Sequence, residues 1–345
     1  MTDCPNNFIC DHAYRYAQMD INGDIFFCCP PWVSNYSIGN IKETPFSEIW
    51  NGEKAREFRR QFMTNEFKYC RTDICLRNPA KADFKYPPES DIAPKPEIFL
   101  FNYDSVCNVR CVFCKDKRMK SNRRLDYFED NMDAILEDML DGVKVVVPSI
   151  SGEALFSPSS RKLIKKINEK FPDIKFSFTS NGLNMTKENL TELGILDKLD
   201  NISISVHACT KKTYKKLVEF SDFDKICENL NFVSKLKKEG NVPPFHFQMN
   251  FVINAYNYKE MPAFAKWAKQ LGADVVFLHL LDSNVNRETY KKLNIFDESH
   301  PKYNDLCDVV KDPIFKESFC NIPDGVVNLQ KVQKSFLQKL KDYFA

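Results

Sequence analysis

The sequence predicts an α/β fold in which a small β-hairpin and helix module precedes a larger domain with a parallel sheet. Six apolar runs rich in β-branched residues recur along the larger part of the chain, and helical patterns with one apolar face stand between them. The runs cover residues 98–102, 143–150, 176–179, 202–206, 245–253 and 275–280. Strands that alternate with helices form parallel sheets, because parallel neighbours need a crossover connection.

Length, charge and cysteine content narrow the possible partners. The 345 residues exceed the usual size of one domain. There are 49 Lys and Arg against 47 Asp and Glu, and this net charge of +2 gives no basic field for nucleic acid. The first residues show no signal-peptide pattern, and no apolar run reaches the roughly 18–20 residues that span a bilayer. We therefore expect a cytoplasmic protein without a nucleic-acid or membrane partner, whose 13 cysteines serve metals rather than disulfides.

The N-terminal module brings several cysteines together. Asn22-Gly23 lies between alternating apolar residues, which strongly indicates a hairpin turn. A short helical turn at 45–50 and a helix at 53–62 follow the hairpin. Two thiols flank the open ends of the hairpin and two follow the helix; they are Cys10, Cys28, Cys70 and Cys75. Four such thiols form a closed site, and geometry alone allows it to hold either zinc or an iron–sulfur cluster.

A second group of cysteines follows the first apolar run of the larger domain. Cys107, Cys111 and Cys114 have the spacing Cys-x3-Cys-x2-Cys. Three thiolates on one tight loop can hold three irons of a [4Fe-4S] cluster, which takes four ligands, so that one iron stays open. An open position is typical of a catalytic metal site. The alternative is a zinc knuckle, but no further cysteine or histidine follows Cys114 before His207.

This cysteine spacing, with the aromatic Phe113 before the third cysteine, resembles the signature of the radical S-adenosylmethionine (SAM) superfamily. The resemblance implies a partial (β/α)6 barrel and a [4Fe-4S] cluster whose open iron binds the amino and carboxylate groups of SAM. It also implies an activity: SAM is cleaved reductively to a 5′-deoxyadenosyl radical, which abstracts hydrogen from a substrate. A flavodoxin or a ferredoxin is the implied electron donor.

The N-terminal module resembles the SPASM and twitch domains, which carry auxiliary [4Fe-4S] clusters in radical SAM enzymes. The matching features are Gly23-x4-Cys28, the doublet Cys28-Cys29, the stretches 39–41 and 48–50, and a final cysteine pair. The module departs from the usual pattern because it precedes the radical domain and offers only four ligands. The resemblance therefore implies one auxiliary [4Fe-4S] cluster on Cys10, Cys28, Cys70 and Cys75. Cys28 is preferred to Cys29 because it has the family spacing from Gly23, and adjacent strand residues face opposite sides.

Three strand ends resemble the SAM-binding elements of the superfamily. Ser-Gly-Glu-Ala at 151–154 is similar to the Gly-Gly-Glu-Pro element, although two of its four positions differ. Thr179 and Asn181 match a Thr-x-Asn-Gly element at the end of the third strand, and Ser205 ends the fourth strand. The alternatives are structural, since Glu153 could cap the next helix and Ser205 could bond only to backbone. By resemblance the cofactor-binding residues are Phe113, Gly152, Glu153, Thr179, Asn181 and Ser205.

The turn after the fourth strand carries a candidate catalytic thiol, Cys209. A thiol at this place could donate a hydrogen atom, as in radical epimerases, with His207 as a proton acceptor. The alternative is that small residues were selected here for a tight strand-to-helix turn.

The expected domains are a SPASM/twitch-like domain at 1–78, a proline-rich extended linker at 79–96, the partial barrel at 97–282 and a C-terminal helical cover at 283–345. We expect a two-electron oxidation of a small polar metabolite such as a sugar or an aminocyclitol, because a second cluster can accept the electron of a substrate radical. The alternatives are a peptide maturase, a radical epimerase and, more remotely, an iron–sulfur electron carrier without catalysis.

Overall fold

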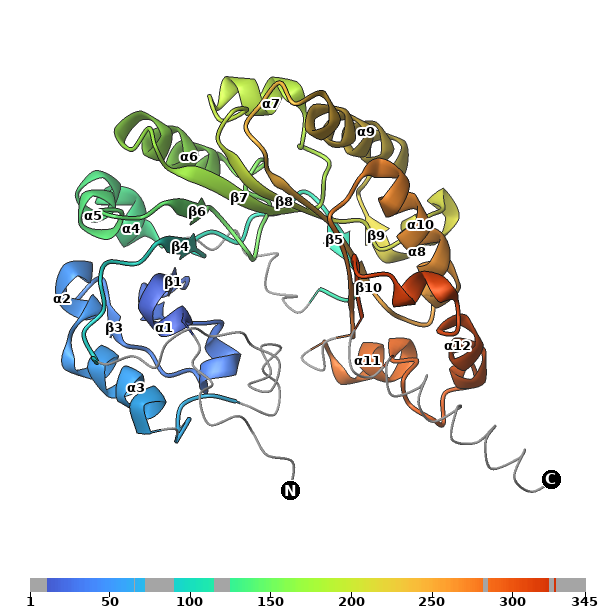
Figure 1. The fold of residues 1–345 in the computed structure, drawn as a ribbon, viewed down its shortest axis with the longest axis horizontal. Helices are drawn as coiled ribbons and strands as arrows, with labels where there is room; N and C mark the ends of the chain where they lie inside the picture. The colour runs from blue at the N-terminus through green and yellow to red at the C-terminus, as the bar shows by residue number, and fades with distance from the viewer. Residues whose placement is uncertain are drawn as a thin grey trace. The chain divides into compact units, whose positions relative to one another are not determined.

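The computed structural model describes residues 11–64, 66–71, 90–114, 125–281 and 285–322, together with Val326. The chain forms two compact units. Unit 1 comprises residues 1–106 and 121–177, and unit 2 comprises residues 107–120 and 178–345. The boundary falls inside strand β7 (Lys175–Ser180), so each unit contains part of this strand (Figure 1). The domain boundaries expected from the sequence remain predictions.

The sheet of unit 1 has the strand order β7-β6-β4-β1-β2-β3. Its strands besides β7 are β1 (Tyr16–Met19), β2 (Asp24–Phe26), β3 (Gly39–Asn40), β4 (Ile98–Phe101) and β6 (Val145–Val147). β1 and β2 form the predicted antiparallel hairpin, with Gln18 opposite Phe26. Gly23 adopts a φ of 89° in its turn, a conformation that favours glycine over other residues. The hairpin prediction is therefore confirmed.

A pairing that the sequence pattern did not predict joins the hairpin to the larger sheet. β1 lies parallel to β4, with Tyr16 opposite Ile98 and Met19 opposite Phe101. Ala17 and Met19 are fully buried, which explains why this short strand needs a neighbour on its open side. The N-terminal module and the first strand of the predicted barrel therefore share one sheet.

The helices of unit 1 are α1 (His12–Arg15), η1 (Pro30–Val33), α2 (Phe46–Trp50), α3 (Glu53–Thr64), α4 (Asp126–Asp130), α5 (Met132–Met139) and α6 (Pro158–Lys170). Arg59 of α3 is fully buried, with its guanidinium 4.7 Å from the ring centroids of both Phe27 and Trp50. Its Nε donates to the Ala13 carbonyl at 2.8 Å, and its Nη1 donates to Oδ1 of Asn51 at 2.8 Å. Burial lowers the pKa of Arg59 to about 10, so it stays charged at neutral pH.

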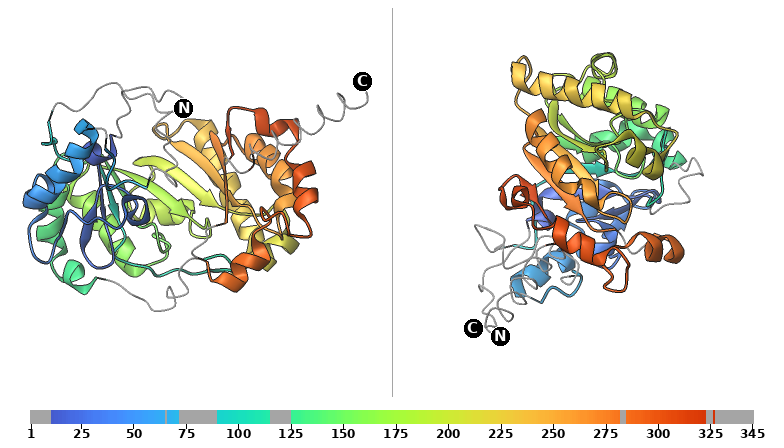
Figure 2. Two further views of the ribbon diagram at one scale, coloured as in Figure 1. Left: turned by 90° about the horizontal axis from the view of Figure 1, so that it is seen from below. Right: turned by 90° about the vertical axis from the view of Figure 1, so that its right-hand side faces the viewer.

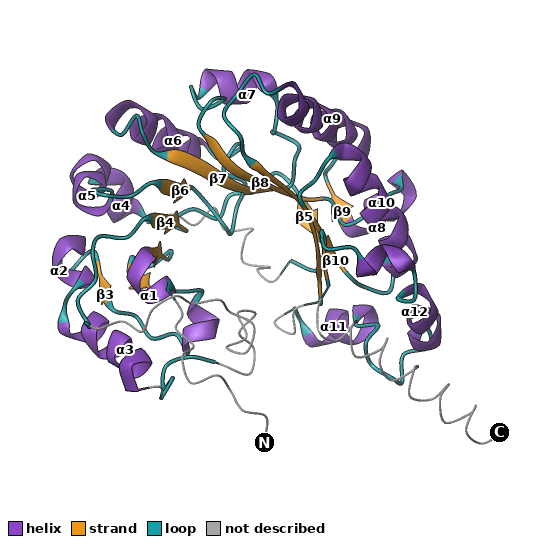
Figure 3. Cartoon of the chain, viewed as in Figure 1, coloured by secondary structure: helices purple, strands orange, loops and turns teal. Residues whose placement is uncertain are grey.

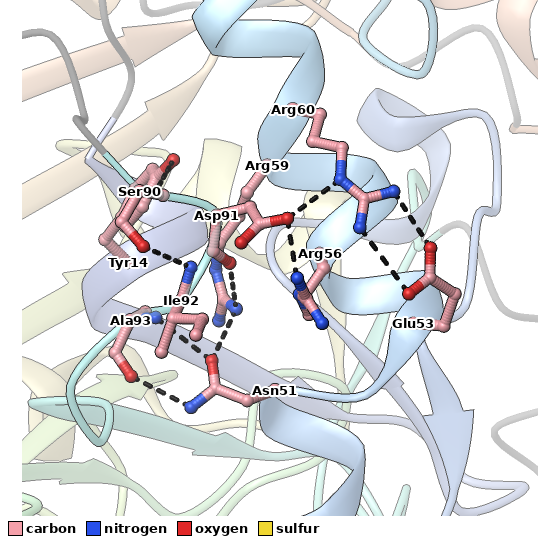
Figure 4. A network of polar contacts seen from close by, with 10 residues as sticks. All are labelled: Tyr14, Asn51, Glu53, Arg56, Arg59, Arg60, Ser90, Asp91, Ile92 and Ala93. Carbon is pink, nitrogen blue, oxygen red and sulfur yellow. Dashed lines mark hydrogen bonds and ion pairs between the residues drawn. The ribbon is translucent and has the colours of Figure 1, made fainter.

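The described end of the proline-rich linker is held against this arginine. Nη1 of Arg59 also donates to the Asp91 carbonyl at 3.2 Å, and the Asn51 side chain exchanges two 3.0 Å hydrogen bonds with the Ala93 backbone (Figure 4). The Trp50 indole N–H donates to the Pro94 carbonyl at 2.6 Å. Residues 91–94 of the expected linker are therefore held in place, because their backbone groups bond to the side chains of Arg59, Asn51 and Trp50. Residues 79–89 lie outside the described residues.

The sheet of unit 2 has the strand order β12-β11-β10-β8-β7. Its strands besides β7 are β8 (Leu199–Ser205), β10 (His246–Val252), β11 (Val275–His279) and β12 (Cys320–Asn321), and a separate ribbon pairs β5 (Arg110–Cys111) with β9 (Val218–Glu219). β10 is parallel to both β8 and β11. All six strands predicted for the larger domain are present as β4, β6, β7, β8, β10 and β11, which confirms the α/β fold with a parallel sheet.

The helices of unit 2 are α7 (Lys187–Glu192), α8 (Lys211–Leu217), α9 (Phe223–Glu239), η4 (Tyr258–Glu260), α10 (Met261–Leu271), α11 (Arg287–Leu293), α12 (Tyr303–Val309) and η5 (Pro313–Lys316). Among them, α7, α9 and α10 lie along one face of the sheet (Figure 3). The ring centroids of Phe251 on β10 and Phe264 on α10 lie 4.8 Å apart, and those of Phe223 on α9 and Trp267 on α10 lie 6.4 Å apart. α9 and α10 are neighbouring helices (Figure 2). The described helices include none that is long and apolar enough to cross a membrane.

The C-terminal part contains helices, as expected, and also a strand. β12 extends the sheet, because Cys320 pairs in parallel with Val276 of β11. The amphipathic helix expected beyond residue 326 lies outside the described residues.

We predict that Arg59→Leu strongly destabilises unit 1, because it leaves buried carbonyl and amide oxygens without their charged donor. The free energy of unfolding should fall by about 3 kcal/mol or more. Thermal unfolding followed by circular dichroism, with limited proteolysis of the 11–71 region, measures this.

Arg60→Leu is the matched control on the next residue of α3. Its side chain bonds to exposed Glu53 at 2.9 Å and to Asp91 at 2.8 Å, so its loss should change stability little. Equal losses in the two variants would show that Arg59 has no special role.

Candidate functional site

The three-cysteine loop is anchored to a strand of unit 2. Cys111 pairs with Val218 in the β5–β9 ribbon, and the backbone N–H of Val112 donates to the Leu217 carbonyl at 2.9 Å. The N–H of Cys114 donates back to the Cys111 carbonyl at 3.1 Å, which closes a tight turn between the last two cysteines. The middle of the loop is therefore fixed by hydrogen bonds that involve no side chain.

The three sulfur atoms influence one another. Burial, with smaller contributions from the neighbouring Cys114 and Cys107, raises the pKa of the Cys111 thiol to about 12. When they are deprotonated, these cysteines carry negative charges that repel one another. A cationic metal centre offsets this repulsion, because it stabilises deprotonated sulfur. Within the described ranges, no group of three or more His, Cys, Asp and Glu is arranged to hold a single metal ion. The donor set of three clustered thiols fits the cubane cluster that the spacing suggests.

Phe113 of this loop packs against a buried histidine. Its ring meets the ring of His207 edge to face, with 4.9 Å between the centroids. His207 is 5% exposed and adopts a φ of 66° directly after β8, a strained conformation for a residue other than glycine. Its Nδ1 accepts a hydrogen bond from the Val252 N–H at 3.1 Å. Phe113 is thus held by the turn that follows β8.

His207 does not suit the role of proton acceptor. Burial, with a smaller contribution from the nearby His279, lowers its pKa to about 3, so the ring is neutral at physiological pH. Because Nδ1 accepts from a backbone N–H, the proton of the neutral ring is on Nε2. His207 can therefore offer a hydrogen-bond donor but not a base.

Asn181, expected at SAM, points to the first cysteine of the loop. Its Nδ2 lies 2.7 Å from Oδ1 of Asn108 and 3.8 Å from Sγ of Cys107. Two further predicted residues lie at strand ends: Thr179 is exposed near the end of β7, and Ser205 is half-buried opposite Asn250 of β10. The roles of all three residues remain predictions.

The Ser-Gly-Glu-Ala segment lies against the backbone that leads into Cys107. A Cβ on Gly152 would lie 2.5 Å from the Val106 carbonyl oxygen, so no other residue fits without movement. The N–H of Glu153 donates to the same oxygen at 2.8 Å, and Glu153 is 1% exposed. The following helix is capped by the side chain of Ser157, so the alternative role of Glu153 as its N-cap is not observed.

Asp104 is a positioning residue that the sequence reasoning missed. Its carboxylate is buried and accepts hydrogen bonds from the Val106 N–H at 2.9 Å, from Ser160 Oγ at 3.1 Å and from Ser157 Oγ. This fixes the backbone between β4 and Cys107. The signal in the sequence is an aspartate three residues after the end of a buried strand.

The auxiliary cysteines of unit 1 are partly described. Cys28 and Cys29 follow β2, and the Trp32 N–H donates to the Cys29 carbonyl at 2.8 Å. The N–H of Arg71 donates to the Trp32 carbonyl at 2.8 Å, which brings the segment around Cys70 to the cysteine doublet. Cys10 and Cys75 lie outside the described residues, and the choice between Cys28 and Cys29 remains open.

The Cys209 thiol is directed at the helices of unit 2. Its Sγ donates to the Glu260 carbonyl at 3.7 Å, and its N–H donates to Oε2 of Glu260 at 2.5 Å. Burial raises its pKa to about 12, with smaller contributions from Glu260 and Cys227. These contacts favour the packing role among the two that the sequence suggested.

The second face of the unit 2 sheet carries polar and aromatic side chains, of which Ser203 and Asn250 are buried. Asn250 Nδ2 donates to Ser203 Oγ at 2.6 Å, and Gln248 Nε2 donates to Asn250 Oδ1 at 2.6 Å. On the adjacent strand, the rings of Phe277 and His279 lie 4.2 Å apart. Asn250 and Gln248 interrupt an otherwise apolar run, which was the sequence signal for this face.

Comparison with known proteins agrees with these features. The profile described as "Radical SAM superfamily" matches residues 102–268, and the profile described as "Iron-sulfur cluster-binding domain" (SPASM) matches residues 10–75. A probable GTP 3′,8-cyclase from Methanocaldococcus jannaschii is 26% identical over 169 residues, which cover 48% of this chain and 53% of that protein. The FeMo cofactor biosynthesis protein NifB from Methanocaldococcus infernus is 29% identical over 132 residues, or 34% of this chain and 42% of that protein.

The chain spans about half the length of the curated relatives it matches. Among solved structures, Streptococcus suis SuiB bound to S-adenosylmethionine has a TM-score of 0.45 and 16% identity, with 66% of this chain and 50% of that chain covered.

The two profile matches together cover about two thirds of the residues and occur in the order expected from the sequence. Membership implies a [4Fe-4S] cluster with SAM in the radical domain and an auxiliary iron–sulfur cluster in the SPASM domain. The chain therefore belongs to the radical SAM superfamily, with a SPASM domain in front of its radical SAM domain.

Proposed function

We propose that this radical SAM enzyme oxidises a small polar metabolite, such as a sugar or an aminocyclitol, by two electrons. When bound, the cluster and SAM supply a 5′-deoxyadenosyl radical that takes one hydrogen atom from the substrate. We assign the cluster to Cys107, Cys111 and Cys114, and SAM contacts to Phe113, Gly152, Glu153, Thr179 and Ser205. The protein's own residues fix the loop, exclude water and orient the substrate.

The polar face of β8, β10 and β11 carries the proposal of a small polar substrate. Ser203, Asn250 and Gln248 present a hydroxyl and two carboxamides that already fix one another's orientation. Phe277 and His279 add an aromatic surface next to them. Hydroxyl and amide groups beside an aromatic surface suit a substrate with many hydroxyl or amino groups, which needs several hydrogen bonds and an apolar ring contact.

The oxidative outcome rests on the second cluster-binding domain. After one hydrogen atom has left the substrate, a further proton and a further electron must leave to complete the oxidation, and the auxiliary site can take the electron. The auxiliary ligands proposed are Cys10, Cys28, Cys70 and Cys75. An external flavodoxin or ferredoxin is the proposed source of the electron that cleaves SAM.

Two alternatives would use the same radical. A radical epimerase needs a hydrogen-atom donor, but the contact of the Cys209 thiol with the Glu260 carbonyl supports a packing role for this thiol. A peptide maturase remains the other alternative, with a peptide in place of the metabolite.

We predict that replacing Cys107, Cys111 and Cys114 together with alanine abolishes reductive SAM cleavage, because no open iron remains to hold SAM. Iron in the anaerobically reconstituted protein should fall from roughly eight to roughly four per chain. Iron and sulfide analysis, with chromatographic detection of 5′-deoxyadenosine after dithionite reduction, measures both effects.

The matched control replaces three other cysteines with alanine: Cys227 on α9, Cys307 on α12 and Cys320 on β12. This variant should keep its iron and its SAM cleavage. If the first variant still cleaved SAM, the assignment of the cluster to the 107–114 loop would be wrong.

We predict a different result for Cys28→Ala and Cys70→Ala. Each should retain dithionite-driven SAM cleavage but lose completion of substrate oxidation, because the electron from the substrate then has no acceptor. Iron analysis and separate assays of 5′-deoxyadenosine and of oxidised product distinguish the two activities.

Cys29→Ala is the matched neighbour for this test and should keep both activities. If Cys29→Ala lost the auxiliary cluster and Cys28→Ala kept it, the ligand choice would reverse. Loss of SAM cleavage in soluble, iron-replete Cys70→Ala would contradict the division of roles between the two sites.

The oxidation itself can be tested with a panel of sugars and aminocyclitols, with GTP and short peptides as comparison arms. We expect one of the sugars or aminocyclitols to stimulate 5′-deoxyadenosine formation and to yield a product two hydrogens lighter by mass spectrometry. The product formed in D2O should carry no deuterium at the reacting carbon, and Cys209→Ala should give the same product.

If only GTP or only peptides stimulated 5′-deoxyadenosine formation, the substrate would belong to that class and not to the sugars or aminocyclitols. Solvent deuterium in the wild-type product that disappears in Cys209→Ala would instead establish epimerisation with quenching by this thiol.

A further inference from the structure

We propose that Asn181 is a positioning residue for Cys107, and that its carboxamide raises the reduction potential of the cluster by donating a hydrogen bond to the Cys107 sulfur. This inference rests on the assignment of Cys107 as a cluster ligand in the proposed function. It gives Asn181 a role toward the cluster in place of the expected contact with SAM.

The orientation of the Asn181 carboxamide follows from its hydrogen bonds. Oδ1 accepts from the backbone N–H of Leu183 at 3.0 Å, and only the oxygen of a carboxamide can accept there. Nδ2 must therefore point the other way, where it lies 2.7 Å from Oδ1 of Asn108 and 3.8 Å from Sγ of Cys107. The amide hydrogens thus face the acceptor oxygen of Asn108 and the sulfur of Cys107.

A chain of asparagines extends from this contact to α7. Asn108 accepts from Asn181 through Oδ1, so its Nδ2 is free to donate, and it does so to Oδ1 of Asn184 at 2.9 Å. The carbonyl of Asn184 accepts from Nδ2 of Asn189 at 2.9 Å. The direction of every donor in the chain is fixed, and the chain ties Asn108, next to Cys107, to a helix.

The turn that carries Asn181 is itself rigid. Gly182 has a φ of 85°, and a Cβ there would lie 2.9 Å from the Ile204 side chain. Buried Asn229 of α9 donates to the carbonyls of Gly182 and Leu183 at 2.7 and 3.0 Å. The position of the Asn181 amide is therefore set by the protein before any cofactor binds.

A hydrogen bond to a thiolate ligand stabilises negative charge on its sulfur. The reduced cluster has one more negative charge than the oxidised cluster, so the bond stabilises the reduced form more and raises the potential. Loss of the donor should make reduction harder. The step is a one-electron reduction in which no bond is made or broken.

The test is a redox titration followed by electron paramagnetic resonance, in the absence of SAM. The titration uses the Cys28→Ala, Cys70→Ala double variant, so that the signal comes from one cluster. If this double variant does not fold, the titration uses the chain with both cysteines intact. The cluster of the 107–114 loop is then identified as the one whose signal changes when SAM is added afterwards. Asn181→Asp keeps the acceptor for Leu183 but loses the donor, and Asn181→Ala loses both. At a fixed potential we expect the reduced-to-oxidised ratio to fall up to about tenfold in each variant, which corresponds to about 59 mV.

Asn184→Ala is the matched control, because it breaks the same asparagine chain without touching sulfur. It should leave the potential unchanged. If both Asn181 variants lost iron while Asn184→Ala kept it, the positioning role would be supported through cluster retention.

Two results would overturn the proposal. One is an unchanged potential in iron-replete Asn181 variants, with or without weaker SAM binding. The other is an equal shift in Asn184→Ala, which would indicate general loosening of the loop. If the wild-type protein formed no 5′-deoxyadenosine, the proposed function would be wrong. The comparison of reduction potentials between the variants would still hold, since the potential is measured without turnover.

Discussion

Three thiols on the loop 107–114 can face one cluster only if the backbone between them is held from outside, because the loop has almost no regular structure of its own. Backbone hydrogen bonds and buried polar side chains fix the backbone of this loop. In unit 2 the β5–β9 pairing fixes Cys111, and the asparagine chain fixes the residue after Cys107. In unit 1 the Asp104 carboxylate fixes the backbone up to Val106. The three proposed ligands are thus ordered by groups that are not proposed as ligands.

Much of the fold follows from patterns that are local in the sequence. The six strands are short runs of β-branched residues with helical patterns between them, and the hairpin depends on one Asn-Gly pair, so both could be predicted. The parallel pairing of β1 with β4 could not be predicted, because it places Tyr16 opposite the distant Ile98. Neither strand has a sequence feature that identifies the strand with which it pairs. The packing of residues 90–96 was missed for a similar reason, because it depends on the buried Arg59.

The candidate site divides in the same way. Cysteine spacing marks the cluster loop, since ligand number and spacing are chemical requirements. The groups that orient the loop have no such signature, because Asp104, Asn108 and Asn184 are polar residues whose hydrogen-bond partners are defined only by the fold. For Asn181 the sequence indicated the neighbourhood, but only the hydrogen bond from Leu183 fixes the direction of its amide.

The position of the SPASM domain before the radical domain has a structural basis within unit 1. A parallel pair cannot be joined by a tight turn, so the chain between β1 and β4 must form a crossover, and residues 20–97 provide it with the hairpin, α2 and α3. Glu97 directly precedes β4, and its carboxylate accepts hydrogen bonds from Arg15 at 2.5 Å and from Lys144 at 2.6 Å. Arg15 precedes β1 and Lys144 precedes β6, so Glu97 links the starts of these three strands. The strand that precedes the cysteine doublet, β2, therefore belongs to the same sheet as β4, which leads to Cys107. An auxiliary domain in this position is part of the sheet itself, and its stability and that of β4 depend on the same contacts.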